Sequence, residues 1–109
     1  LSFFASYCEP CKRELPMLNA LVDELEKKAI KVIIVGFNED FDRFGDMLAK
    51  LKVDKPIILS DKYGKVGQKY GVTHLPASFF IGLDGKVREV VRGEMTDQVL
   101  RDKIEKLLR

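Results

Sequence analysis

The hydrophobic residues of this chain follow two kinds of pattern. Short runs rich in β-branched and aromatic residues are typical of buried strands, whereas apolar spacings of three and four residues are typical of helices with one buried face. The run Lys31–Phe37 (KVIIVGF) is nearly uninterrupted, which indicates a strand covered on both faces. The pattern predicts buried strands at Leu1–Ala5, Lys31–Phe37 and Pro56–Leu59, helices at Pro10–Lys28, Phe41–Lys52 and from Asp61 to about Tyr70, two further strands at Ala77–Leu83 and Lys86–Val91, and a last helix at Thr96–Leu108.

The order of these elements predicts an α/β fold. Strands and helices alternate as far as Tyr70, and two strands joined by Asp84-Gly85, a strong hairpin signal, then precede the last helix. We therefore predict a single domain over residues 1–109, with a central mixed sheet and helices on both faces. Because the sequence starts abruptly inside its first strand, we expect one or more preceding strands to be missing from it.

The helical periodicity also assigns individual side chains. Pro16 lies about two turns into the first helix and should kink it. Asp40, Asp42 and Asp61 are interpreted as turn and cap residues, with Asp61 capping the third helix, and Thr96 or Asp97 should cap the last one. The inward-facing positions are predicted to be Leu15, Leu18, Leu21, Val22 and Leu25 in the first helix, Phe44, Met47, Leu48 and Leu51 in the second, and Val99, Ile104, Leu107 and Leu108 in the last.

Composition and charge exclude several classes of protein. The 109 residues, 46% of them hydrophobic, suffice for one core. The 19 basic and 17 acidic residues are interleaved, so no nucleic-acid partner is expected. No apolar run approaches the roughly 18 residues that a membrane span needs, and the start lacks the pattern of a signal peptide. We expect a monomer.

The two cysteines lie in Cys8-Glu9-Pro10-Cys11, where the first strand meets the first helix. Unpaired N–H groups and the positive end of the helix dipole favour a thiolate at Cys8, which is therefore the predicted nucleophile. Cys11 is one turn further on and should be less exposed. It is predicted to attack a mixed disulfide at Cys8 and so release the reduced substrate. Pro10 suits the first turn, where a missing N–H costs nothing.

Two other readings of the cysteines remain open. A purely structural disulfide would close so small a loop that it would remove little chain entropy. A zinc site needs about four ligands, and the chain offers two cysteines and His74, which leaves a carboxylate or water to complete the site. The prediction is a redox pair without a metal and without a bound cofactor.

Two segments carry a resemblance to a known family. The stretch Phe3–Pro16 (FFASYCEPCKRELP) resembles the pattern F-W-A-x-W-C-x-P-C-x-x-E-x-P of the thioredoxin superfamily, and more narrowly of TlpA/ResA-like thiol-disulfide oxidoreductases with a thioredoxin-like domain of the AhpC/TSA-Redoxin type. The stretch Tyr70–Ile81, with Asp84-Gly85 after it, is similar to the cis-proline loop and strand of that family. Residues 41–59 match its extra α-β insertion. The resemblance implies a three-layer thioredoxin-like fold.

The resemblance also implies a substrate-binding site. Pro76 would be cis and face the cysteines, and the backbone of Leu75 would pair with the substrate polypeptide. Tyr7 would contact substrate beside Cys8, although it replaces a tryptophan of the family pattern. His74 would lie near the mouth of the site and make it sensitive to pH, but a plain solvent-facing loop histidine is an equal alternative.

Acidic residues near the cysteines would modulate them. Glu14 coincides with the acidic position of the family motif, and the resemblance implies that it tunes thiol acidity and passes a proton. Glu9, between the cysteines, would oppose a thiolate at Cys8 by its charge. By composition alone, Glu14 would instead be a surface glutamate favourable to the helix dipole.

The function implied by the resemblance is reduction of protein disulfides through the Cys8–Cys11 pair. The implied setting is an extracytoplasmic bacterial domain, anchored or fused at its N-terminus and re-reduced by a membrane thiol-disulfide transporter. Apocytochrome c, reduced before haem attachment, is one substrate of the family. The alternative is a non-catalytic binding module on a thioredoxin scaffold, with an idle or structural CxxC.

Overall fold

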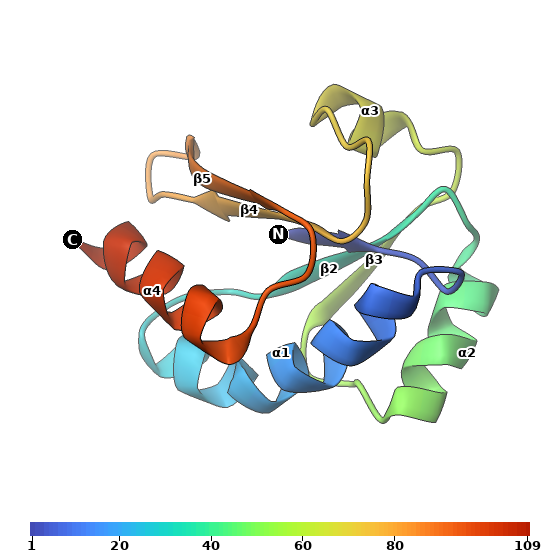
Figure 1. Ribbon diagram of the computed structural model, residues 1–109, viewed down its shortest axis with the longest axis horizontal. Helices are drawn as coiled ribbons and strands as arrows, with labels where there is room; N and C mark the ends of the chain where they lie inside the picture. The colour runs from blue at the N-terminus through green and yellow to red at the C-terminus, as the bar shows by residue number, and fades with distance from the viewer.

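In the computed structural model, which describes residues 1–109, strands and helices follow one another in the predicted order (Figure 1). Both segments of the predicted hairpin are strands, and the alternating pattern before them holds throughout. The elements are β1 (Ser2–Phe4), α1 (Glu9–Lys27), β2 (Ile33–Phe37), α2 (Phe41–Leu51), β3 (Ile57–Asp61), α3 (Lys65–Lys69), β4 (Ala77–Ile81), β5 (Val87–Arg92) and α4 (Asp97–Leu108).

The strands form one mixed sheet in the order β3-β2-β1-β4-β5. β1, β2 and β3 are parallel, whereas β4 runs antiparallel to both β1 and β5. Phe3 of β1 lies opposite Val35 of β2 on one side and Ala77 of β4 on the other. The carboxyl ends of the three parallel strands and the start of β4 therefore lie at the same edge of the sheet, which is where β1 leads into the cysteines.

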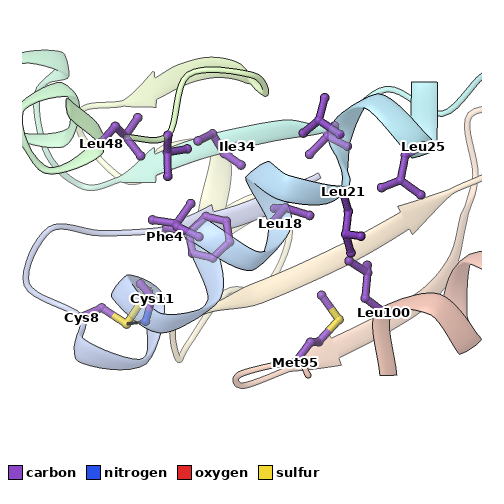
Figure 2. Packing of buried hydrophobic residues seen from close by; sticks show 14 of the residues in the cluster. Phe4, Cys8, Cys11, Leu18, Leu21, Leu25, Ile34, Leu48, Met95 and Leu100 are labelled. Carbon is purple, nitrogen blue, oxygen red and sulfur yellow. Dashed lines mark hydrogen bonds between the residues drawn. A yellow bond between two sulfur atoms is a disulfide. The ribbon is translucent and has the colours of Figure 1, made fainter. Parts of the chain in front are cut away.

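Helices cover both faces of the sheet, so the predicted three-layer architecture is confirmed. α1, α2 and α4 lie on one face and α3 on the other (Figure 1). Because side chains alternate along a strand, Phe4 packs in the larger core under α1, while its neighbour Phe3 packs in the smaller core under α3. Figure 2 shows the larger core, where residues of β1, α1, β2 and α4 meet, among them Phe4, Leu18, Leu21, Leu25, Ile34 and Leu100.

Most predicted buried faces are confirmed. All five residues assigned to the inner face of α1 are buried, as are Phe44, Met47 and Leu48 of α2. α1 continues through Pro16, which is exposed. α2 sits close to the sheet because Gly36 of β2 has no side chain: a Cβ there would lie 2.6 Å from Cγ of Phe44.

Two predictions about local structure were wrong. The third strand is not buried, because β3 is an edge strand whose Ile57 and Leu59 are exposed. In α4 the buried positions are Leu100 and Ile104, whereas Val99 and Leu108 are exposed. The apolar face is thus centred on the spacing 100, 104 and 107, and Val99 and Leu108 lie one position to either side of it.

Asp61 is the last residue of β3 and is not the N-cap of α3, a position that Gly64 occupies. Its carboxylate nevertheless accepts hydrogen bonds from the N–H groups of Val66 and Gly67, at 3.1 and 2.8 Å. The predicted capping role is therefore fulfilled from the preceding strand. Thr96 and Asp40 are N-caps, as predicted. None of the four helices combines the length and the apolar character required to span a bilayer.

Candidate redox site

The cysteines are positioned by the junction between β1 and α1. β1 ends at Phe4, and the chain turns so that the Cys8 N–H donates to the carbonyl of Ala5 at 3.3 Å. Cys8 is the N-cap of α1 in an extended conformation, and its Sγ accepts a hydrogen bond from the Cys11 N–H at 3.3 Å. Pro10 lies in the first turn, where no N–H is needed. A sulfur at this position faces the positive end of the helix, which stabilises a thiolate.

Cys8 and Cys11 are joined by a disulfide, with their Cα atoms 5.3 Å apart (Figure 2). Their burial differs as predicted: Cys8 retains 9% of its exposure and Cys11 none. Of the two cysteines, only Cys8 therefore keeps some contact with solvent. This asymmetry is what a nucleophile with a resolving partner behind it requires.

Glu14 is a buried carboxylate and not a surface glutamate. It is 1% exposed, and its Oε1 accepts a hydrogen bond from the Met95 N–H at 2.6 Å. Its other oxygen, Oε2, has no hydrogen-bond partner. Burial raises the pKa of Glu14 to about 7, and the negative charge of Glu94 acts in the same direction, while the bond from Met95 opposes the shift. Glu14 can therefore exchange a proton near neutral pH.

The segment Gly93–Met95 connects α1 with the proline loop. The Gly93 N–H donates to the carbonyl of Pro76 at 2.8 Å, and Met95 donates to Glu14. Between them, the carboxylate of Glu94 accepts three hydrogen bonds from the Arg13 guanidinium, at 2.9, 3.1 and 3.3 Å. This segment therefore links Glu14 of α1 to Pro76 of the proline loop, although the two residues lie far apart in the sequence.

The Leu75–Pro76 peptide bond is cis, as the resemblance implied, and Pro76 is fully buried. The following residue, Ala77, starts β4 and lies opposite Phe3 of β1. The proline loop is thus held at the edge of the sheet from which the cysteine loop leaves. Leu75 is half-buried and packs against both core clusters.

Tyr7 flanks Cys8 and is 61% exposed. Its hydroxyl donates to the carbonyl of Phe37 at 3.4 Å, and partial burial together with the charge of Glu39 raises its pKa. Glu9 is exposed and forms an ion pair with Lys12 at 3.0 Å. His74 is exposed and pairs through Nδ1 with the Thr73 hydroxyl at 3.1 Å, so its proposed influence on the cysteines stays a prediction.

One residue beside the cysteine loop was missed in the sequence. Glu39 follows β2 and is 7% exposed, and both of its carboxylate oxygens accept hydrogen bonds from Ser6. The signal that could have found Glu39 is an acidic residue two positions after a buried strand that runs parallel to the strand before the cysteines, because the ends of such strands share one edge of the sheet.

Metal binding finds no support in this arrangement. No group of three or more His, Cys, Asp or Glu side chains is placed so that it could hold a metal ion.

A cysteine pair at the N-terminus of a helix, a cis-proline loop at the same edge of the sheet and a mixed sheet with this strand order define a thioredoxin-like fold. The model of the AhpC/TSA family matches residues 1–90. The chain belongs to the AhpC/TSA family.

Relatives in sequence carry names that agree with this class. The chain is 31% identical over 107 residues to the thiol-disulfide oxidoreductase ResA of Bacillus thuringiensis subsp. konkukian, which covers 98% of this chain and 61% of that protein. It is 30% identical over 102 residues to ResA of Bacillus subtilis, covering 94% of this chain and 56% of the relative. The chain thus spans about three fifths of the length of these relatives.

Solved structures agree with the fold. StoA from Bacillus subtilis is 26% identical, with a TM-score of 0.79 over 93% of this chain and 77% of that structure. The structure of dsbF from MTB, solved in mixed oxidised and reduced forms, is also 26% identical, with a TM-score of 0.87 over 97% of this chain and 77% of that structure.

Proposed function

We propose that this chain is a thiol-disulfide oxidoreductase that reduces disulfides in protein substrates. The observation that carries the proposal is the asymmetry of the cysteine pair: Cys8 caps the helix and reaches the surface, whereas Cys11 is fully buried behind it. The names of the ResA relatives, which are thiol-disulfide oxidoreductases, support the same activity.

The reaction follows from this geometry in two exchanges. The Cys8 thiolate attacks one sulfur of a substrate disulfide, so that a mixed disulfide forms and the other substrate sulfur leaves as a thiolate. Cys11 then loses its proton and attacks Sγ of Cys8, which forms the intramolecular disulfide and releases the second substrate thiolate. Two electrons pass from the protein to the substrate. The substrate thiolates take up protons from water or from the site.

Glu14 is the carboxyl group proposed to accept the Cys11 proton. It lies three residues after Cys11, hence on the same side of α1, and both side chains are buried. With a pKa of about 7 it is partly deprotonated at neutral pH and can act as a base. Its negative charge also opposes a thiolate at the pair, which makes the dithiol a better electron donor.

The substrate groove is proposed to consist of Tyr7 on one side of Cys8 and the loop His74–Pro76 on the other. A substrate strand would pair with the backbone of Leu75, beside the cis-proline. We further propose an extracytoplasmic location, a membrane thiol-disulfide transporter as electron donor, and apocytochrome c as one substrate. The support for these three assignments is the family resemblance.

The activity can be tested by insulin reduction with dithiothreitol as the electron source. We expect this chain to accelerate insulin precipitation above the uncatalysed rate, and Cys8→Ser to abolish the acceleration. Cys11→Ser should accumulate mixed disulfides with substrate, since the resolving thiol is lost. In the reduced protein, iodoacetamide should label Cys8 before Cys11, because only Cys8 is accessible.

A non-catalytic binding module would give the opposite outcome. Precipitation at the uncatalysed rate, together with equal labelling of the two cysteines, would contradict the proposed activity. Serum albumin at the same concentration controls for non-specific effects of protein on the precipitation.

A further inference from the structure

Glu39 is a buried carboxylate that no step of the proposed exchange uses. Its Oε1 accepts a hydrogen bond from the Ser6 backbone N–H at 2.7 Å, and its Oε2 accepts one from the Ser6 hydroxyl at 2.5 Å. Hydrogen bonds to an ionised acceptor are stronger than neutral ones. The Glu39 side chain thus binds both the backbone N–H and the hydroxyl of Ser6, a residue that lies two positions before Cys8.

Glu39 is itself held in place by the neighbouring strand. The Ser60 hydroxyl of β3 donates to the carbonyl of Glu39 at 2.9 Å, and the Asn38 N–H donates to the carbonyl of Asp61 at 2.8 Å. Ser6 and Glu39 lie two residues beyond the ends of β1 and β2, and Ser60 lies in β3, so the three residues follow three neighbouring strands of the sheet. The cysteine loop is therefore fastened to a rigid neighbour and not only to its own helix.

We propose that Glu39 is a positioning residue for Cys8, an inference that rests on the proposed oxidoreductase function. The two bonds to Ser6 fix the path of the chain from β1 into α1. This path sets where Sγ of Cys8 lies relative to the Cys11 N–H that it accepts from. Without the bonds, the loop has more conformations, and fewer of them place the thiolate against the helix N-terminus.

Two substitutions separate the hydrogen bonds of Glu39 from its charge. Glu39→Gln removes the charge but keeps the bonding capacity, because an amide oxygen can accept from the Ser6 N–H and an amide N–H can donate to the Ser6 hydroxyl. Glu39→Ala removes both. The Ala and Gln variants have the same charge, so any difference between them reports the hydrogen bonds.

The first readout is the pH dependence of Cys8 alkylation by iodoacetamide in the reduced, folded protein. We expect the midpoint to be higher in Glu39→Ala than in Glu39→Gln, because the thiolate is less stabilised. The second readout is insulin reduction, for which kcat/KM should be roughly tenfold lower in the Ala variant than in the Gln variant. Identical pH profiles and identical kcat/KM values in the two variants would overturn the proposal.

Asn19→Ala is the matched control for a loss of stability. Asn19 also binds two backbone N–H groups of another segment, those of Asp54 and Lys55, at 3.1 and 2.9 Å, but it does so where the chain enters β3, away from the cysteines. Its loss should leave the alkylation profile of Cys8 unchanged. A shift as large as that of Glu39→Ala would show that the profile follows global stability, and would refute a positioning role.

Ser6→Ala keeps the test decisive if Glu39→Ala does not fold. This variant loses the hydroxyl bond and keeps the N–H bond, so we expect a shift in the same direction and of smaller size. An unchanged profile in Ser6→Ala would refute the proposal in that case. Alkylation needs no substrate, so a wild-type chain that fails to reduce insulin would refute the proposed function while the role of Glu39 is still measured.

Discussion

Replacing Glu14 with glutamine should make the stability of this protein less dependent on pH. The carboxylate is buried, with one oxygen bound to the Met95 N–H and the other without a partner. A glutamine of the same shape keeps an oxygen for the Met95 N–H but never carries a charge. The substitution therefore removes the ionisation and leaves the packing nearly unchanged.

The expected magnitude follows from the pKa of Glu14. Burial raises it from 4.5 to about 7, so the folded state holds a proton that the unfolded state releases between these two values. The stabilisation from this proton is complete below the unfolded pKa and is lost as the pH rises through the folded one. The difference between the two pKa values corresponds to about 3 kcal/mol of unfolding free energy. The wild type loses this free energy as the pH rises through that range, and Glu14→Gln does not.

Urea unfolding followed by far-ultraviolet circular dichroism measures this difference, since the chain has no tryptophan to report unfolding. The oxidised wild type and Glu14→Gln should be compared at several pH values between about 5 and about 8. The variant should gain stability relative to the wild type as the pH rises. Glu26→Gln, at an exposed position of the same helix, controls for the loss of a negative charge.

Parallel curves of unfolding free energy against pH for the wild type and Glu14→Gln would refute the reasoning. They would mean that the carboxylate keeps an ordinary pKa in the folded protein, through hydration or a partner. In that case Glu14 would be a weaker base for Cys11 than a carboxylate whose pKa lies near neutral pH.

Two further predictions concern the redox pair and the core. The reduction potential should lie on the thioredoxin side, near about −270 mV, when measured by equilibration against glutathione or dithiothreitol, and a value above about −180 mV would instead indicate an oxidase or isomerase. Gly36→Ala should destabilise the protein by about 1–3 kcal/mol in urea unfolding, because its Cβ would lie 2.6 Å from Cγ of the buried Phe44. Gly45→Ala on α2, where the nearest side-chain atom is 3.8 Å away, should not destabilise it and serves as the control.

The sequence predicts elements whose signals are local. The spacing of Leu15, Leu18 and their neighbours, and the uninterrupted run around Ile34, depend on adjacent residues, and both were confirmed. The position of the cysteine pair at a helix N-terminus could be predicted for the same reason, since Cys8 and Cys11 lie within one turn of the start of α1. The exposure of Ile57 could not be predicted from the sequence, because it depends on the position of β3 at the edge of the sheet.

The burial of the two carboxylates near the cysteines, Glu14 and Glu39, also could not be predicted from neighbouring residues. Glu14 could be selected only by its place in a family motif, because its burial depends on Met95, which is 81 residues away. Glu39 has no motif of its own, and its partner Ser6 is 33 residues away. A sequence shows which residues can ionise, but the fold decides which of them lose contact with water.

The contact between Glu14 and Met95 determines when, during synthesis, the surroundings of the cysteine pair can be completed. Cys8, Cys11 and Glu14 leave the ribosome close together, whereas the backbone N–H that binds Glu14 belongs to Met95, 81 residues after Glu14. Until Met95 has been synthesised, the contact between its N–H and Glu14 cannot form, and the environment of the cysteine pair is incomplete. The nascent chain can therefore form the Cys8–Cys11 bond, or a bond to another thiol, before the environment that tunes the pair exists.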